Sequence, residues 1–157
     1  MIVRLTLGVV LAGALLAATA PALTAVRADA ADAAMERQLG SLADRLRSMA
    51  AVDDAVRGGG ARRVATLRLP ARSPTTAGIE AVRFRRRAGG AVATWRTERG
   101  TTGTERLADV PIRPTQAARV LAEPGPHRLV FALRREAEGP LLTVRRPDDR
   151  ETATAGS

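Results

Sequence analysis

The sequence predicts an α+β protein in which an N-terminal transmembrane helix continues into an amphipathic helix packed on a small antiparallel β-sheet. Three observations support this fold: an uncharged apolar run near the start, a helical stripe of apolar residues after it, and alternating strand patterns beyond a glycine cluster. They divide the chain into a membrane anchor or signal segment (1–26), an amphipathic helix (27–57), an antiparallel β domain (58–147) and a disordered polar tail (148–157).

The apolar run covers residues 5–26 without a charge. As a helix it would extend about 33 Å, enough for the ~30 Å hydrocarbon layer of a bilayer. A cleaved signal peptide is the alternative, because Ala-Thr-Ala at 18–20 resembles a cleavage site. Pro21 follows that site and fixes the backbone where a protease needs an extended substrate, so we favour a retained anchor. Arg4 then stays inside and the domain lies outside the cytoplasm, or is secreted if the leader is cleaved.

The segment 27–57 has the apolar spacing of an amphipathic helix. Five residues recur at alternating intervals of four and three, on one stripe: Met35, Leu39, Leu42, Leu46 and Met49. The position that would continue the stripe is Asp53, so the repeat is too short to argue a coiled coil by itself. We expect the stripe to pack on the following domain, or alternatively against a second copy. Glycines 58–60 are expected to end the helix.

Beyond the glycines the apolar residues alternate with polar ones, which is typical of strands with one buried face. The residues expected in the core are Ala65, Leu67, Leu69, Val82, Phe84, Ala91, Ala93 and Trp95. Pro111 reduces the segment 108–112 to an edge strand or a loop. The clearest pattern predicts a hairpin, with Leu129, Phe131 and Leu133 on one strand, a turn at 136–140, and a return strand.

Composition argues against an enzyme. The chain has one histidine and no cysteine, so it has no disulfide, and any metal site would need oxygen ligands. His127 has no partner in the sequence pattern that would make it a general base, and a surface or half-buried histidine is the simpler interpretation. We therefore expect no catalytic residues, no metal and no cofactor.

Charge is the feature that suggests binding. All 25 basic residues are arginine, the net charge is +9, and residues 58–146 hold 18 arginines against seven acids. The strand phases place six of them away from the core, as a candidate interaction face: Arg68, Arg83, Arg85, Arg96, Arg134 and Arg145. Such a face suits an acidic partner or an anionic ligand. Nucleic acid is disfavoured because no aromatic residue lies among these arginines on the same face. The alternative is a solvated face whose arginines discourage aggregation.

Four segments carry a resemblance to a known family: MIVR (1–4), ARRVATLRLPARSPTTAGIEAVRF (61–84), ATWRT (93–97) and GPHRLVFALRR (125–135). With them the chain resembles the small membrane-anchored, pilin-like proteins of haloarchaea, a family of unknown function associated with type IV pilus-like machinery. The resemblance implies a pilin-like layout, in which a membrane helix continues into a head of antiparallel strands.

From these observations we expect a non-enzymatic structural or accessory component of a pilus-like or cell-surface assembly. Its partners would be membrane lipid along residues 5–26 and another protein of the assembly, and self-association remains open. The alternative is a membrane-anchored binding module for an anionic ligand or acidic partner.

Overall fold

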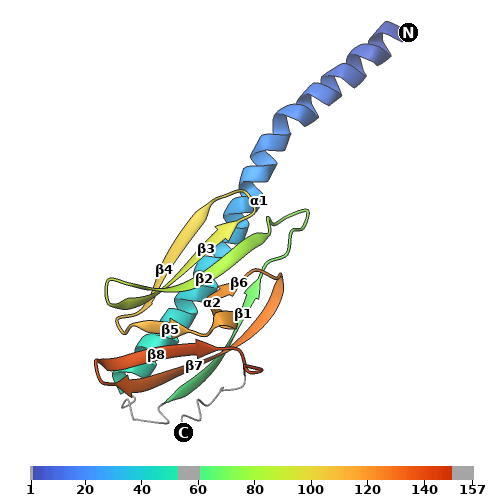
Figure 1. Cartoon of the computed structure of the whole chain (residues 1–157). Helices are drawn as coiled ribbons and strands as arrows, with labels where there is room; N and C mark the ends of the chain where they lie inside the picture. The colour runs from blue at the N-terminus through green and yellow to red at the C-terminus, as the bar shows by residue number, and fades with distance from the viewer. Residues whose placement is uncertain (1, 53–60, 150–157) are drawn as a thin grey trace.

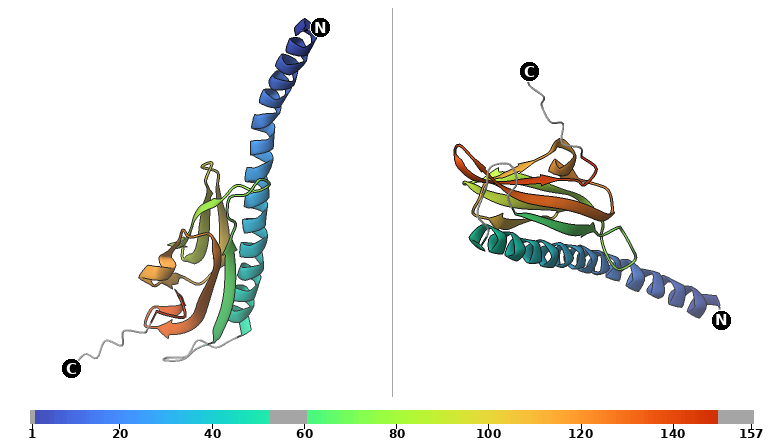
Figure 2. Two further views of the ribbon diagram at one scale, coloured as in Figure 1. Left: turned by 90° about the vertical axis from the view of Figure 1, so that its right-hand side faces the viewer. Right: turned by 90° about the horizontal axis from the view of Figure 1, so that it is seen from below.

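A computed structural model describes residues 2–52 and 61–149. Its first element is a single helix, α1 (Ile2–Val52), which combines the two helical segments expected from the sequence. The later part of α1 packs along the β-strands, and the earlier part projects beyond them (Figures 1 and 2). Ala25 and Val26 are exposed, whereas Ala28 and Ala31 are buried. The β-strands and the buried part of α1 are called the head below, and it begins at about Arg27.

The predicted apolar stripe of α1 is confirmed, because all five of its residues are at most 6% exposed. Ala28 and Ala31 extend it toward the N-terminus, since they lie one helical turn apart and one turn before Met35. Asp53 and the glycines at 58–60, which were expected to end the stripe and the helix, lie outside the described residues.

The head contains eight strands and one short helix among the described residues: β1 (Arg62–Leu69), β2 (Ile79–Arg87), β3 (Gly90–Thr97), β4 (Thr102–Ala108), β5 (Ile112–Pro114), α2 (Gln116–Arg119), β6 (Val120–Leu121), β7 (Gly125–Glu136) and β8 (Gly139–Arg145). Every residue that the alternation assigned to the core is buried or half-buried. The predicted hairpin is β7–β8, in which Phe131 pairs with Val144 and Leu133 with Leu142.

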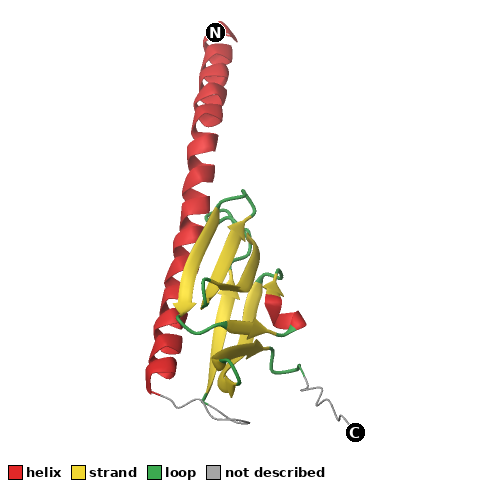
Figure 3. Cartoon of the chain, turned by 60° about the vertical axis from the view of Figure 1, so that its left-hand side comes forward, coloured by secondary structure: helices red, strands yellow, loops and turns green. Residues whose placement is uncertain are grey.

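The expectation of one antiparallel sheet was wrong in two respects. The strands form two four-stranded sheets, with orders β1-β7-β8-β5 and β4-β3-β2-β6, called sheet A and sheet B below (Figure 3). In addition, β5 runs parallel to β8. The physical reason is that alternation reports which face of a strand is buried and says nothing of its neighbours. Two sheets that bury their inner faces against each other produce the same pattern as one sheet under a helix.

The two sheets share one core, which α1 closes along one side. Phe84 of sheet B and Phe131 of sheet A meet edge to face, with ring centroids 6.1 Å apart. The helix contacts β1 of sheet A and β3 and β4 of sheet B. On the other side of the core, β2 of sheet B contacts β5 of sheet A, and α2 contacts both strands. The head is therefore one domain with two seams between its sheets, one covered by α1 and one by α2.

Candidate functional site

The structure divides the six predicted arginines between the two sheets. Arg83 and Arg85 on β2 and Arg96 on β3 lie in sheet B, whereas Arg68, Arg134 and Arg145 lie in sheet A. A single ladder of six arginines therefore does not form. Strand phase predicts only which side of its own strand a residue faces, whereas the assignment of strands to sheets decides which arginines are neighbours.

Sheet B carries the more open basic surface. Across sheet B, Arg83 pairs with Thr94 and Thr94 with Thr104, and in the next outward-facing row Arg85 pairs with Val92 and Val92 with Arg106. All six positions are on the face opposite Phe84 and Trp95, because in-register residues point to the same side of a sheet. We call Arg83, Arg85 and Arg96, with Thr94 and Thr104, the arginine face. A shallow groove of about 520 Å³ runs over it.

Acidic neighbours neutralise only part of the arginine face. Arg96 Nε lies 3.9 Å from Glu80, and both side chains are more than half exposed. Arg106, at the border of the face, is held at 2.7 Å by Asp109. Arg83 and Arg85 form no ion pair with any described residue. The face therefore keeps a net positive charge, and solvent screens it strongly because its groups are exposed.

A second groove lies at the seam that α2 covers, and sequence reasoning missed two of its arginines. It has a volume of about 460 Å³ and is lined by Arg83, Arg85, Arg86, Arg119, Phe84, Pro114 and Val120, without an acid. Arg86 has the same strand phase as Phe84, which predicts an inward side chain, but the end of β2 extends past the core and Arg86 is exposed. Arg119 belongs to the four-residue helix α2, which is too short to give a periodic signal.

The arginines of sheet A have structural contacts. Arg145 is half-buried, and its Nη1 donates to the carbonyl oxygens of Arg146, Pro147 and Asp149 at 3.3 to 3.4 Å. Arg134 is half-buried as well. Arg145 therefore contributes to the fold of the C-terminal end rather than to an open basic surface.

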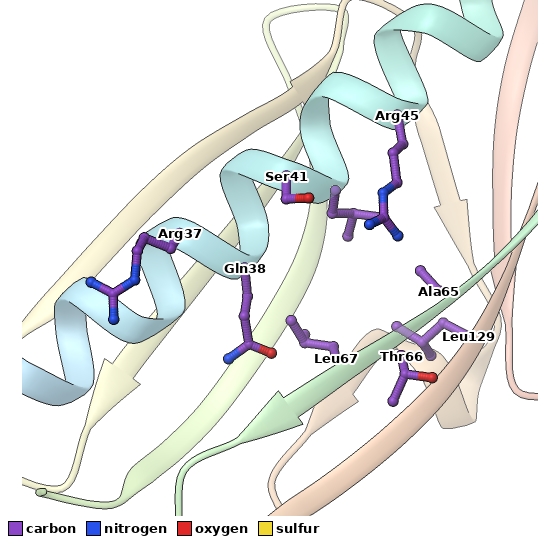
Figure 4. A pocket seen from close by; sticks show the side chains of 9 residues that line it. Arg37, Gln38, Ser41, Arg45, Ala65, Thr66, Leu67 and Leu129 are labelled. Atoms are coloured by element: carbon purple, nitrogen blue, oxygen red, sulfur yellow. The ribbon is translucent and has the colours of Figure 1, made fainter.

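Arg68 is tied to α1 through its backbone. The Gln38 carboxamide accepts the Arg68 N–H at 2.9 Å and donates to the Arg68 carbonyl at 3.0 Å. This pair of hydrogen bonds replaces a neighbouring strand at the edge of sheet A. Beside it lies a groove of about 270 Å³ between α1 and β1, with Leu42, Leu67 and Leu129 among its lining residues (Figure 4).

His127 is buried within the head, and its ring contacts the backbone. Nε2 lies 2.6 Å from the carbonyl oxygen of Glu123. Because a carbonyl oxygen only accepts, Nε2 must carry the hydrogen of this bond. Among residues 2–52 and 61–149, no group of three His, Cys, Asp or Glu side chains is placed to hold a metal ion.

Asp149 is the described group whose pKa clearly departs from its ordinary value. The Thr115 hydroxyl, which donates to it at 2.6 Å, lowers the pKa most, and the Arg146 N–H and the charges of Arg146 and Arg145 lower it further. Burial opposes this shift. The carboxylate joins the end of β8 to the residue before α2, so it acts as a clasp on the C-terminal turn.

The expected membrane segment 5–26 is helical in its backbone, but most of its side chains lie outside the described part of the structure. Within the part that is described, none of the helices has the length and apolar character needed to cross a bilayer.

The two-sheet head with a long helix and an arginine face defines a small α+β domain. Residues 2–147 match the family described as "Domain of unknown function (DUF7311)", so the chain belongs to that family. No curated protein and no solved structure matches it.

Proposed function

We propose that the protein is a non-enzymatic structural or accessory component of a pilus-like or cell-surface assembly. In this proposal residues 5–26 anchor it in the membrane, with the N-terminus inside and the head outside the cytoplasm. The long helix serves as the connection between the membrane and the head.

The observation that carries the proposal is the division of α1 into two parts. From Ala28 onward one stripe of the helix belongs to the core, whereas the earlier part extends away from the head (Figure 2). Isolated helices are marginal in water, so a helix that extends away from its head needs a further source of stability. A membrane or neighbouring subunits would supply it. The order of the elements, a long helix that continues into a β head, supports this role.

The test is to isolate surface filaments and their membrane-bound assembly machinery from cells that produce the protein. We expect the protein in one of these fractions, cross-linked to another component through residues of the projecting part of α1. A cross-linker placed at Gly13 should capture a partner, and one placed at Ser48, an exposed position within the head, serves as the matched control. Absence of the protein from both the filaments and the machinery would remove the proposal.

A second candidate is a membrane-anchored module that binds an anionic ligand or an acidic partner. It is supported by Arg83 and Arg85, which line both basic grooves and have no acidic partner among the described residues. Guanidinium groups without an acidic partner are available for bidentate contacts with carboxylates or phosphates.

This candidate predicts that the protein binds a polyanion such as heparin with an affinity that falls steeply with salt. The double substitution Arg83→Glu and Arg85→Glu should abolish binding. Arg128→Glu, a substitution of an exposed residue on β7 of sheet A, should leave most of the binding intact. A flat dependence on salt would dismiss the candidate.

A further inference from the structure

At the end of the head nearest the projecting part of α1, two loops meet the helix (Figure 2). The β1–β2 loop is fixed there because the Ala77 N–H donates to the Arg27 carbonyl at 3.0 Å. The β3–β4 turn joins it because the Glu98 N–H donates to the Gly78 carbonyl at 3.0 Å. Three segments that are distant in the sequence thus form one corner, directly after the uncharged run 5–26.

This corner encloses a small cavity with a strong excess of positive charge. Its volume is about 200 Å³, and it is lined by Arg27, Arg72, Ser73, Thr76, Ala77, Glu98 and Arg99. Three guanidinium groups therefore face one carboxylate. None of the three makes an ion pair or a hydrogen bond with a residue that the structure describes. The charge is thus not explained by contacts within the head.

One of these groups also has a buried nitrogen atom without a partner. Arg27 Nε is inaccessible to solvent and has no hydrogen-bond acceptor among the described residues. Burying an N–H donor of a charged group costs free energy when the donor has no acceptor, and native structures rarely contain such a donor. The cost disappears if an oxygen of a bound anion accepts the Nε–H. Arg72 and Arg99, which line the same cavity, make an anion the fitting acceptor.

We propose that this corner binds the phosphate group of an anionic membrane phospholipid. A phosphate offers several acceptor oxygens, and a guanidinium fork can donate to two of them at once. The side chain of Ser73 is held at the cavity by the N–H groups of Thr75 and Thr76, which its Oγ accepts at 3.3 and 3.1 Å. Its own hydroxyl hydrogen and that of Thr76 are additional donors to a phosphate.

The position of the cavity identifies a lipid as the source of the phosphate. Arg27 is the first charged residue after the run 5–26, so a bilayer spanned by this run would place its headgroups at the level of Arg27. This part of the inference rests on the membrane anchoring in the proposed function. The phosphate site itself rests on the cavity, its three arginines and the buried Nε.

The experiment uses the full chain in an uncharged detergent, with arginine labelled for NMR. The Arg27 Nε–H signal is followed while inorganic phosphate or soluble short-chain phosphatidylglycerol is added, with sodium chloride of equal ionic strength as the blank. We expect saturable shifts with both probes and tighter binding of the phospholipid. Arg72→Gln and Arg99→Gln should each weaken binding about fivefold. Arg45→Gln, an equal loss of charge on an exposed site of α1, should not.

Four other outcomes separate the parts of the inference. Binding of phosphate without binding of the phospholipid would overturn the lipid source and keep the phosphate site. An Arg27 signal that responds to neither probe, or an Arg45→Gln effect as large as that of Arg72→Gln, would overturn the site. If the cellular protein proves not to be membrane-bound while phosphate still binds, the proposed anchoring fails and the site stands.

Discussion

The indole N–H of Trp95 on β3 donates to Asp32 Oδ1 on α1 at 2.5 Å. The two residues are 63 positions apart, and the bond joins the helix to sheet B in a partly buried site at the border of the core. The Trp95 ring lies over Gly103, where a Cβ atom would come within 2.0 Å of the ring. The seam between α1 and sheet B therefore depends on a polar bond, a large ring and a residue without a side chain.

Asp32→Ala should destabilise the head by about 1–3 kcal/mol, because the Trp95 N–H then loses its acceptor in a partly buried site. Chemical unfolding followed by Trp95 fluorescence, the only tryptophan signal, measures the change. Asp29→Ala removes an equal charge from an exposed site one turn earlier and should have little effect. Equal losses of unfolding free energy in the two variants would contradict the role of this hydrogen bond.

The Phe84–Phe131 contact should be the main link between the two sheets. Replacing either phenylalanine by alanine is expected to lower the free energy of unfolding by about 3–5 kcal/mol, because each side chain is at most 1% exposed. To isolate the contact, Phe84→Leu and Phe131→Leu are combined in a double-mutant cycle of unfolding free energies. A coupling of about 0.5–1.5 kcal/mol is expected for an edge-to-face pair. Additive effects would show that the rings are independent.

The backbone of the turn between β2 and β3 is strained at one residue, and a substitution there should relieve the strain. Ala88 and Gly89 both have positive φ, at 47° and 76°, as in the two-residue hairpin turns that favour Asn-Gly. Alanine adopts this region at a cost of about 1–2 kcal/mol, and asparagine tolerates it better. Ala88→Asn should therefore raise the unfolding free energy by up to about 1 kcal/mol. Ala88→Val should lower it, and an increase with valine would exclude this explanation.

The Asp149 clasp should make stability depend on pH in the acid range. Its pKa is lowered in the folded protein, so it contributes stability above its ordinary value near 3.8, and this contribution is lost as the pH falls through the folded pKa. Asp149→Asn should be less stable than the natural protein at pH 7, by at most ~1 kcal/mol because solvent screens the group. The difference should vanish in strong acid, whereas a constant difference would contradict the assignment. Thr115→Val should reproduce most of the effect.

The sequence predicted local structure well and the arrangement of strands poorly. The stripe from Met35 to Met49 and the alternation in β2 and β7 were read correctly, because burial imposes a period on each element. β4 was missed because its first residues, Thr102 to Glu105, include no large apolar side chain that could alternate with polar ones. β6 and α2 are too short to have a period. Pro111 correctly indicated an interruption, but the parallel pairing of β5 with β8 depends on distant contacts.

The candidate site shows the same limit. Arg83, Arg85 and Arg96 were found because strand phase alone placed them outside the core. Arg27, Arg72 and Arg99 come from a helix, a loop and a turn, and only the folded chain brings them to one cavity. No periodic signal could have grouped them.

The most direct test of the account is cell fractionation combined with mass determination of the native protein. The account predicts that the chain stays with the membranes, carries residues 5–26, and exposes its head on the outer side to added protease or label. A full-length chain found freely dissolved inside the cell would contradict it.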